Sequence, residues 1–305
     1  MSSAAAGAAL SRIWPPPGPL DVALTLRPLA RGAGDPTHRV LPSGIWRTAV
    51  TPEGPATVRL VVADAIRADA WGPGAEWMLA AVPDLLGASD SAEGLVPSHA
   101  FVAAAARRMT GLRLARTGLV FEQVVPAVLE QKVTGTEARR SWRELLRRFG
   151  SAPPGPAPEG MRLLPSPAEW LAIPDWEWHR AGVDSTRRRA IRAAATVAGR
   201  LEECAAMPVA DAVRRLRSLP GIGVWTAAEV VQRALGAPDE VSVGDYHVAA
   251  WVGWALIGRP LDDDGMLAEL APYAGHRQRV VRMVEAGYVK PRFGPRATVR
   301  DYRAM

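Results

Sequence analysis

The segment Leu219-Pro220-Gly221-Ile222-Gly223-Val224-Trp225-Thr226-Ala227 lies between two stretches with helical periodicity, residues 209–217 and 225–235. Two glycines one residue apart permit a tight reversal of the chain with backbone N–H groups that point outward. The following helix begins at the same place, and the positive end of its dipole favours an anion. The segment therefore predicts a helical hairpin that binds an anion through its backbone, with an ordinary helix–helix turn as the alternative.

The chain beyond residue 98 has the same helical character. Apolar residues recur there at the three- and four-residue intervals of one helical face. The further windows of this kind are residues 121–129, 142–149, 185–201, 247–256 and 277–285. A Pro- and Gly-rich stretch, residues 151–158, is expected to link two helices. This part is therefore predicted to be all-α.

The first part of the chain has strand-like patterns instead. Residues 1–20 are Ala-rich and then Pro-rich, so we expect a flexible segment without regular structure. Alternating apolar residues at 22–26 indicate a half-buried strand. Two β-rich runs, residues 45–50 and 57–62, flank a turn-forming sequence and predict an antiparallel hairpin. A helix is expected at residues 76–86.

These patterns divide the chain into four parts. They are a flexible segment (1–20), an α+β domain (21–112), an all-α domain (113–288) and a basic tail (289–305).

Composition sets limits on function. The chain has 305 residues, a formal charge of +6 and one cysteine, Cys204, which excludes an intramolecular disulfide and a cysteine-ligated zinc or iron–sulfur site. No segment approaches the roughly 20 apolar residues of a membrane span, so we expect a soluble, cytoplasmic protein. The modest positive charge permits a nucleic-acid partner without requiring one.

Several motifs together resemble one family. They are Phe121-Glu122, Leu129-Glu130-Gln131, the hairpin, Arg233, Gly236, Pro238-Asp239 and Asp245-Tyr246-His247-Val248. Over residues 111–285 the chain resembles the helix-hairpin-helix (HhH-GPD) DNA glycosylase superfamily, in particular its 3-methyladenine DNA glycosylase II branch. The resemblance implies a mainly α fold, the helix-hairpin-helix glycosylase fold, with an N-terminal α+β domain that contains an antiparallel sheet.

The resemblance also implies an activity and a partner. The activity is removal of alkylated bases of the 3-methyladenine and 7-methylguanine type from duplex DNA, as the first step of base excision repair. The implied protein is a monomer at the bacterial nucleoid. Its implied partner is double-stranded DNA that contains damaged bases, and no membrane binding is implied. No cofactor or catalytic metal is implied, except a structural monovalent cation held by carbonyl groups around Leu219 and Ile222.

Asp245 is the predicted catalytic residue. Cleavage of the bond between a base and deoxyribose passes through a sugar cation, and a fixed carboxylate beside C1′ stabilises that charge or orients the attacking water. A single acid suffices for an alkylated purine, because a cationic base leaves without being protonated. Asp is also a favoured helix cap, and both roles are compatible.

Trp225 and Tyr246 are the predicted walls of a base pocket. The indole of Trp225 suits stacking on a flipped-out, cationic base. Relatives with lyase activity carry a Lys at the position of Trp225, so the resemblance implies hydrolysis without β-lyase activity. Packing in the protein core is the alternative for both aromatic residues.

The predicted DNA contacts lie on two turns. The hairpin supplies Gly221, Ile222, Gly223 and Thr226, and the turn after residue 129 supplies Gln131, Lys132 and Thr134. The family fills the gap left by the extruded base from this second turn, often with an apolar side chain. Lys132 departs from that pattern, and a solvated surface charge is its alternative.

Other interpretations remain open. One is a non-catalytic hairpin protein that binds DNA, and another is a glycosylase for oxidised, deaminated or bulky bases. Among the basic clusters, Arg187-Arg188-Arg189 indicates a solvated helix face, whereas Arg277, Arg279 and Arg282 fit either structural ion pairs or DNA contacts.

Overall fold

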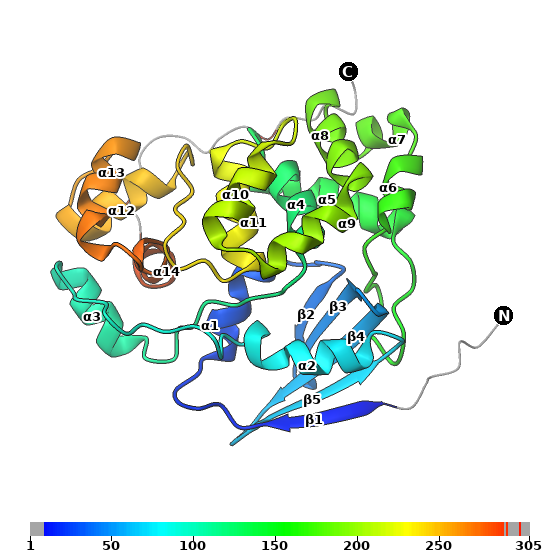
Figure 1. Cartoon of the computed structure of the whole chain (residues 1–305), viewed down its shortest axis with the longest axis horizontal. Helices are drawn as coiled ribbons and strands as arrows, with labels where there is room; N and C mark the ends of the chain where they lie inside the picture. Colours follow the sequence, from blue (N-terminus) through cyan, green and yellow to red (C-terminus); the bar gives the residue numbers. More distant parts are fainter. Residues whose placement is uncertain (1–8, 290, 292–298, 300–305) are drawn as a thin grey trace.

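The computed structural model of the chain describes residues 9–289, 291 and 299. The predicted basic tail, 289–305, thus lies almost wholly outside the described residues, and residues 1–8 of the predicted flexible segment lie outside them too. Figure 1 shows a sheet below and a larger body of helices above it.

The sheet is antiparallel, with the strand order β1-β5-β4-β3-β2. Its strands are β1 (Leu10–Trp14), β2 (His38–Leu41), β3 (Gly44–Thr51), β4 (Gly54–Val62) and β5 (Ile66–Trp71). The predicted hairpin is confirmed as β3 and β4, with Thr51 opposite Gly54 at its turn.

The two faces of the sheet are covered differently. One face packs on α2 (Ala75–Leu85), which confirms the helix expected there. On the other face Trp46 and Trp71 stack with ring centroids 5.6 Å apart. The predicted linker crosses this face, since Gly155 lies against the ring of Trp71 and Thr57 Oγ1 donates to Pro154 O at 2.7 Å. The linker is therefore a packed part of the structure.

Two expectations for the N-terminal part were wrong. The segment 1–20 is not wholly irregular, because residues 10–14 form β1, and every residue of β1 pairs with β5. Residues 22–26 form helix α1 (Val22–Leu26) and not a strand. Asp21 explains the helix, since its carboxylate accepts the N–H of Leu24 at 2.9 Å and caps the first turn.

The helical body confirms the predicted windows. Its α-helices are α3 (Ala100–Arg108), α4 (Val120–Leu129), α5 (Gly135–Phe149), α6 (Pro167–Ala172), α7 (Asp175–Arg180), α8 (Ser185–Thr196), α9 (Ala198–Glu202), α10 (Val209–Arg217), α11 (Val224–Ala234), α12 (Val248–Ile257), α13 (Asp263–Leu270) and α14 (Arg277–Gly287). Short 3₁₀ turns are η1 (Arg27–Leu29), η2 (Glu203–Ala206) and η3 (Ala271–Tyr273). Among the described residues, no helix is long and apolar enough to cross a membrane.

Helix α4 is the centre of the main core. Nearly all of its side chains are buried, and it packs on α11, α8 and α5. Its amino end is capped from outside, because the Glu202 carboxylate accepts the N–H groups of Val120 and Phe121, both at 2.8 Å. A second helical core joins α3 to α12 and α14. The molecule thus has two groups of helices, and the hairpin lies in the first.

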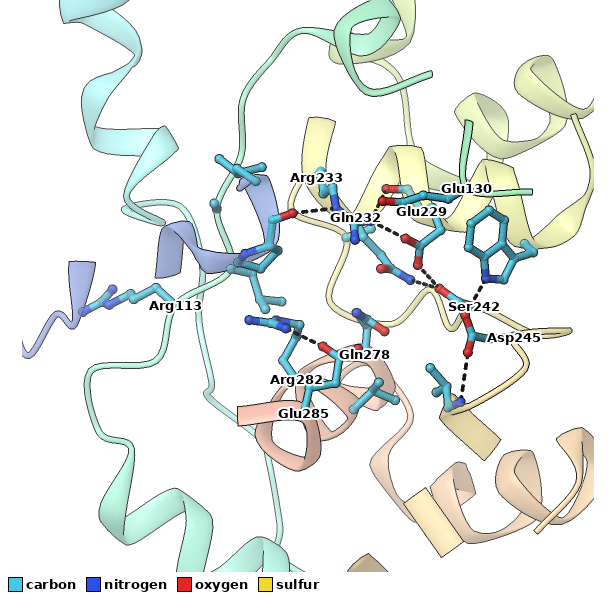
Figure 2. A pocket seen from close by; sticks show the side chains of 18 residues that line it. Arg113, Glu130, Glu229, Gln232, Arg233, Ser242, Asp245, Gln278, Arg282 and Glu285 are labelled. Carbon is cyan, nitrogen blue, oxygen red and sulfur yellow. Dashed lines mark hydrogen bonds and ion pairs between the residues drawn. The ribbon is translucent and has the colours of Figure 1, made fainter. Parts of the chain in front are cut away.

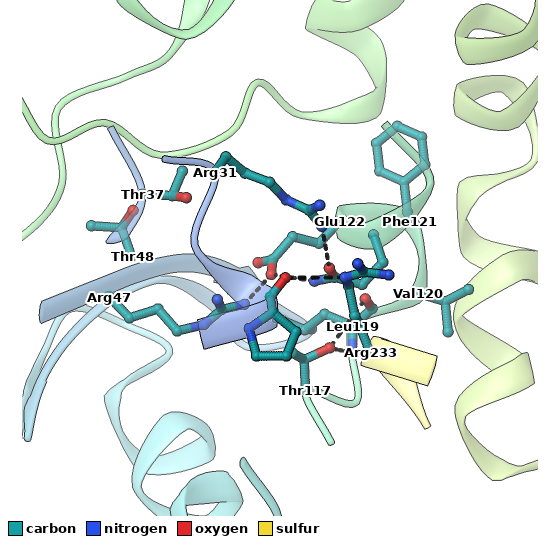
Figure 3. Close-up of polar contacts among 12 residues, drawn as sticks. Arg31, Thr37, Arg47, Thr48, Thr117, Leu119, Val120, Phe121, Glu122 and Arg233 are labelled. Carbon is teal, nitrogen blue, oxygen red and sulfur yellow. Dashed lines mark hydrogen bonds and ion pairs between the residues drawn. The ribbon is translucent and has the colours of Figure 1, made fainter. Parts of the chain in front are cut away.

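Buried charges join the sheet to the helical body (Figure 3). Arg47 on β3 forms an ion pair with Glu122 on α4, and Arg31 pairs with Glu130 at 3.3 Å. Burial raises the pKa of the Glu122 carboxyl, although Arg47 beside it acts in the opposite direction. Trp142 adds a hydrogen bond from its indole to Asp35 at 3.0 Å. These contacts hold η1 and its neighbours against α4 and α5.

Asp69 on β5 binds side chains of three strands, among them Ser11 on β1. Its carboxylate accepts hydrogen bonds from Ser11 at 2.7 Å, Arg59 at 2.7 Å and Arg67 at 3.0 Å. Burial alone would raise the pKa of Asp69, but these three donors outweigh burial and lower the pKa from 3.8 to about 2. The ionised carboxylate therefore stabilises the folded chain above pH 4, and this stabilisation is lost as the pH falls toward 2.

We expect Asp69→Asn to lower the free energy of unfolding at pH 7 by about 2 kcal/mol. The difference from the parent protein should close between pH 4 and pH 2, as measured by urea unfolding at several pH values. Asp64→Asn, in the exposed turn before β5, is the matched control and should show no such pH dependence. A difference for Asp69→Asn that is equally large at pH 2 and pH 7 would contradict this assignment.

Candidate active site

The hairpin predicted at residues 219–227 joins α10 to α11. Gly221 has a φ of +83°, and a Cβ at this residue would lie 2.7 Å from the Cβ of Ala190 on α8. Ile222 is buried in the main core, and its N–H donates to Leu219 O at 3.1 Å. The turn is therefore locked against α8, and glycine is required at position 221. The cation predicted at these carbonyls stays a prediction.

The amino end of α11 is open to solvent. Its N-cap residue is Gly223, which has no capping side chain and no neighbouring atom within 4 Å of its Cβ position. Within the described residues, the N–H groups of Gly223, Val224 and Trp225 have no acceptor. This is the arrangement that the predicted anion site requires.

A second turn, between α4 and α5, is tied to the hairpin. Gln131 Nε2 donates to Gly221 O at 2.9 Å and to Thr226 Oγ1 at 2.8 Å. Lys132 at the tip of the turn is exposed and has a φ of +53°, the only positive value for a residue other than glycine in the described part of the chain. A strained, exposed residue held beside the hairpin is typical of a functional position.

The ends of this turn are fixed by Arg187 and Thr134. Arg187 on α8 donates to Leu129 O at 3.0 Å, and Thr134 caps α5 in a reciprocal pair of hydrogen bonds with Glu137. Arg187 is only 2% exposed, so the expected solvated helix face was wrong for this residue. Gln131 and Thr134, predicted as DNA contacts, both have partners within the protein and shape the turn that presents Lys132.

Asp245 lies in the loop between α11 and α12. Its Oδ1 accepts the N–H groups of His247 at 2.7 Å and Val248 at 3.0 Å, which caps α12. Its Oδ2 accepts the indole N–H of Trp225 at 3.0 Å. The capping alternative is therefore present in the structure, and the same side chain also contacts the first turn of the hairpin's second helix.

Asp245 and Trp225 line a cavity of about 150 Å³ (Figure 2). The walls come from η1, the loop 113–115, the carboxyl end of α4, the loop before Asp245, and helices α11, α12 and α14. A cavity of roughly this volume accommodates a ring the size of benzene. The N-terminal part of the chain thus contributes directly to the site through Pro28 and Leu29.

The cavity is rich in carboxylates. Three of them form ion pairs: Glu130 with Arg31, Glu229 with Arg233, and Glu285 with Arg282. Asp245 is the one lining carboxylate that has no cationic partner among the described residues. Its negative charge is therefore held by N–H dipoles alone and is available to a cation in the cavity.

The pKa of the Arg233 guanidinium group depends on the carboxylates around it. Burial would lower the pKa of its guanidinium group, but the carboxylates of Glu229, Glu130 and Glu285 outweigh burial and raise the pKa. The ion pair with Glu229 and the nearby carboxylates therefore keep Arg233 charged despite its burial.

The two predicted pocket walls lie in different places. Trp225 is partly buried and lines the cavity. Tyr246 is 90% exposed, is not among the lining residues, and packs edge-on against the ring of His247 at 4.8 Å. Asp245 caps α12 from the loop before it, and Tyr246 lies in the exposed turn between this cap and the helix. Its ring is therefore in solvent. The structure therefore brings Asp245 and Trp225 together, without Tyr246.

The arginines of α14 have separate roles. Arg277 forms an ion pair with Asp239, and the buried Arg279 forms one with Asp90. Both arginines form structural ion pairs, which is one of the two alternatives that the sequence left open. Arg282 lines the cavity.

Several residues of the site were missed in the sequence. Glu229, Gln232, Ser242 and Gln278 all line the cavity. Ser242 Oγ donates to the Glu229 carboxylate and accepts from Gln232 Nε2, so this group forms a hydrogen-bonded wall. The spacing of Gln278 and Arg282, four residues apart in a helical window, was the available signal, since it places both on one face of α14.

The comparisons with known proteins concern the fold. No protein-family model matches the chain, and no curated protein sequence matches it significantly. Among solved structures, the chain is similar to a 3-methyladenine DNA glycosylase from Archaeoglobus fulgidus, at 18% identity and a TM-score of 0.70 over 90% of this chain and 97% of that chain.

Two further structures were solved with DNA. An 8-oxoguanine glycosylase/lyase from Clostridium acetobutylicum, in complex with double-stranded DNA, has 10% identity and a TM-score of 0.60 over 88% of this chain and 91% of that chain. A 3-methyladenine DNA glycosylase from Schizosaccharomyces pombe, in complex with abasic DNA, has 14% identity and a TM-score of 0.51 over 64% of this chain and 94% of that chain. The chain therefore has the helix-hairpin-helix DNA glycosylase fold with an N-terminal sheet.

The two glycines of the hairpin provide a matched pair of substitutions. Gly221→Ala should lower the free energy of unfolding by at least about 1 kcal/mol. The backbone at this residue is in the left-handed region, which alanine disfavours, and the new Cβ would be too close to Ala190. Gly223→Ala should change the free energy of unfolding by less than about 0.5 kcal/mol, since its Cβ would meet open space. Urea unfolding of both variants measures this difference. Equal destabilisation by the two substitutions would refute the hairpin geometry.

Proposed function

We propose that this chain is a monofunctional DNA glycosylase that hydrolyses the N-glycosidic bond of alkylated bases in duplex DNA, the first step of base excision repair. The proposed bases are of the 3-methyladenine and 7-methylguanine type. The observation that carries the proposal is an Asp245 carboxylate that has no cationic partner in the described part of the chain and is fixed beside a cavity and beside the amino end of the hairpin's second helix. The glycosylase fold supports it.

The proposed reaction begins when the damaged nucleotide leaves the double helix and its base enters the cavity against Trp225. The bond between C1′ and the ring nitrogen breaks, and both electrons leave with the base. Asp245 stabilises the positive charge that develops on the sugar. The oxygen of a water molecule then bonds to C1′, and the proton of that water passes to solvent through the Asp245 carboxylate. The products are the free base and an abasic site.

The proposed grip on DNA uses two neighbouring turns. The free N–H groups at Gly223, Val224 and Trp225 suit a backbone phosphate, since both their geometry and the helix dipole favour an anion. Lys132 extends from the adjoining turn, where its methylene groups suit the gap left by the base and its ammonium group suits a phosphate. The intramolecular hydrogen bonds of Gln131 keep the two turns together.

The nucleophiles of the chain support the proposal of hydrolysis without lyase activity. A lyase forms a covalent imine between an amine and C1′. The chain has only two lysines, Lys132 and Lys290. Lys132 does not line the cavity, and Lys290 lies outside the described residues. Trp225, at the hairpin position facing Asp245, has no nucleophilic amine.

We expect Asp245→Asn to lower the rate of base release from methylated duplex DNA by about 100-fold or more, because an amide cannot stabilise the sugar cation. Thermal stability should be nearly unchanged, since Asn is as good a helix cap as Asp. Base release is measured by mass spectrometry of the free bases. Asp262→Asn, at the cap of α13, is the matched control and should retain full activity. Equal rates for Asp245→Asn and the parent protein would remove Asp245 from its proposed role.

Borohydride trapping tests the absence of lyase chemistry. Reduction during the reaction converts an imine between enzyme and DNA into a stable covalent complex. We expect no trapped complex on denaturing gels while free bases are released. A trapped complex would contradict the monofunctional proposal, and its loss in Lys132→Gln would identify Lys132 as the nucleophile.

A further inference from the structure

Gln278 and Arg282 form one wall of the cavity. They lie four residues apart on α14 and therefore on the same face of the helix. In Figure 2 the Gln278 side chain rises from α14 toward the middle of the lining residues, with Arg282 beside it.

The Gln278 amide has no hydrogen-bond partner in the described part of the chain, although the residue is only 5% exposed. The other lining amide, Gln232, donates to Ser242 Oγ at 2.9 Å and to Glu240 O at 2.8 Å. A buried polar group without a partner destabilises the folded protein, and natural proteins rarely keep one without a function. A ligand in the cavity is the natural partner for this amide.

Arg282 has a second unused group in the same wall. One of its guanidinium nitrogens, Nη1, pairs with the Glu285 carboxylate, whereas Nη2 is buried and has no partner in the described structure. The wall therefore offers one acceptor, Gln278 Oε1, and donors from Gln278 Nε2 and Arg282 Nη2.

We propose that Gln278 and Arg282 read the hydrogen-bonding edge of the base and select a 6-oxopurine over a 6-aminopurine, an inference that rests on the proposed function. A 6-oxopurine carries a ring N–H beside a carbonyl oxygen. The N–H donates to Gln278 Oε1, and the carbonyl accepts from Gln278 Nε2 and Arg282 Nη2. Alkylated guanine is thus the preferred substrate class, ahead of alkylated adenine.

A 6-aminopurine fits this wall less well. Its exocyclic amino group is a donor where the 6-oxopurine has an acceptor. Rotation of the Gln278 amide restores a pair of hydrogen bonds to an aminopurine. The guanidinium group of Arg282 cannot adapt in this way, because it has donors only. Arg282 therefore decides between the two classes of base, and Gln278 supplies part of the binding to each.

The test measures two bases released from one substrate. Methylated duplex DNA contains both 7-methylguanine and 3-methyladenine, and mass spectrometry gives the initial rate for each. We expect the ratio of 7-methylguanine to 3-methyladenine release to fall about tenfold or more, relative to the parent protein, when Arg282→Met is combined with Glu285→Gln, which leaves no unpaired carboxylate. Gln278→Met should lower the release of both bases, because Gln278 supplies part of the binding to each.

Two controls separate recognition from folding. Gln123→Met removes a buried amide outside the cavity that already has partners, so it should lower stability without changing the ratio of released bases. Gln278→Met should not lower the midpoint of thermal unfolding, because it removes a buried group that lacks a partner.

An unchanged ratio when Arg282→Met is combined with Glu285→Gln, an unchanged release of both bases in Gln278→Met, or a large loss of stability in Gln278→Met would overturn this inference alone. A parent protein that releases no base from methylated DNA would instead contradict the proposed function.

Discussion

A single carboxylate, held by three N–H groups and by no cation within the described residues, is the feature on which the site depends. Trp225 donates to one oxygen of Asp245, and the backbone at His247 and Val248 donates to the other. Dipolar donors fix the position of the carboxylate and leave its net charge in place, whereas an arginine or lysine would neutralise that charge. Trp225 joins this carboxylate to the hairpin, so the element proposed to hold the DNA backbone also orients the acid.

The N-terminal sheet has a direct part in this arrangement. Buried ion pairs between Arg47 and Glu122 and between Arg31 and Glu130 hold it to α4. Its extension η1 closes one side of the cavity, where Pro28 O accepts a hydrogen bond from Arg233 at 3.1 Å. Removal of one partner from such a buried pair is costly. The N-terminal part of the chain therefore belongs to the site through η1, and the sheet is held to the helical body beside it.

The sequence predicted the parts of the site that depend on local signals. The paired glycines predict the hairpin, and Asp at the start of an apolar helix window marks Asp245 once the resemblance to the glycosylase family is added. The placement of Gln278, Glu229 and Ser242 depends on how distant helices pack, which one sequence does not reveal. Arg187 was misjudged because a charged residue is usually exposed, and here three hydrogen-bond partners permit its burial. Alternation over five residues suggested a strand at residues 22–26, where the Asp21 cap determines a helix.

The most direct test of the role of Asp245 measures how a positive charge at the sugar changes the affinity for DNA. Two duplexes are compared, one with a neutral tetrahydrofuran abasic nucleotide and one with a pyrrolidine ring, which places a positive charge close to the sugar carbon. We expect the parent protein to bind the cationic duplex at least about tenfold more tightly and Asp245→Asn to lose most of this preference. Equal affinity of the parent protein for the two duplexes, or a preference that persists in Asp245→Asn, would contradict this role of Asp245.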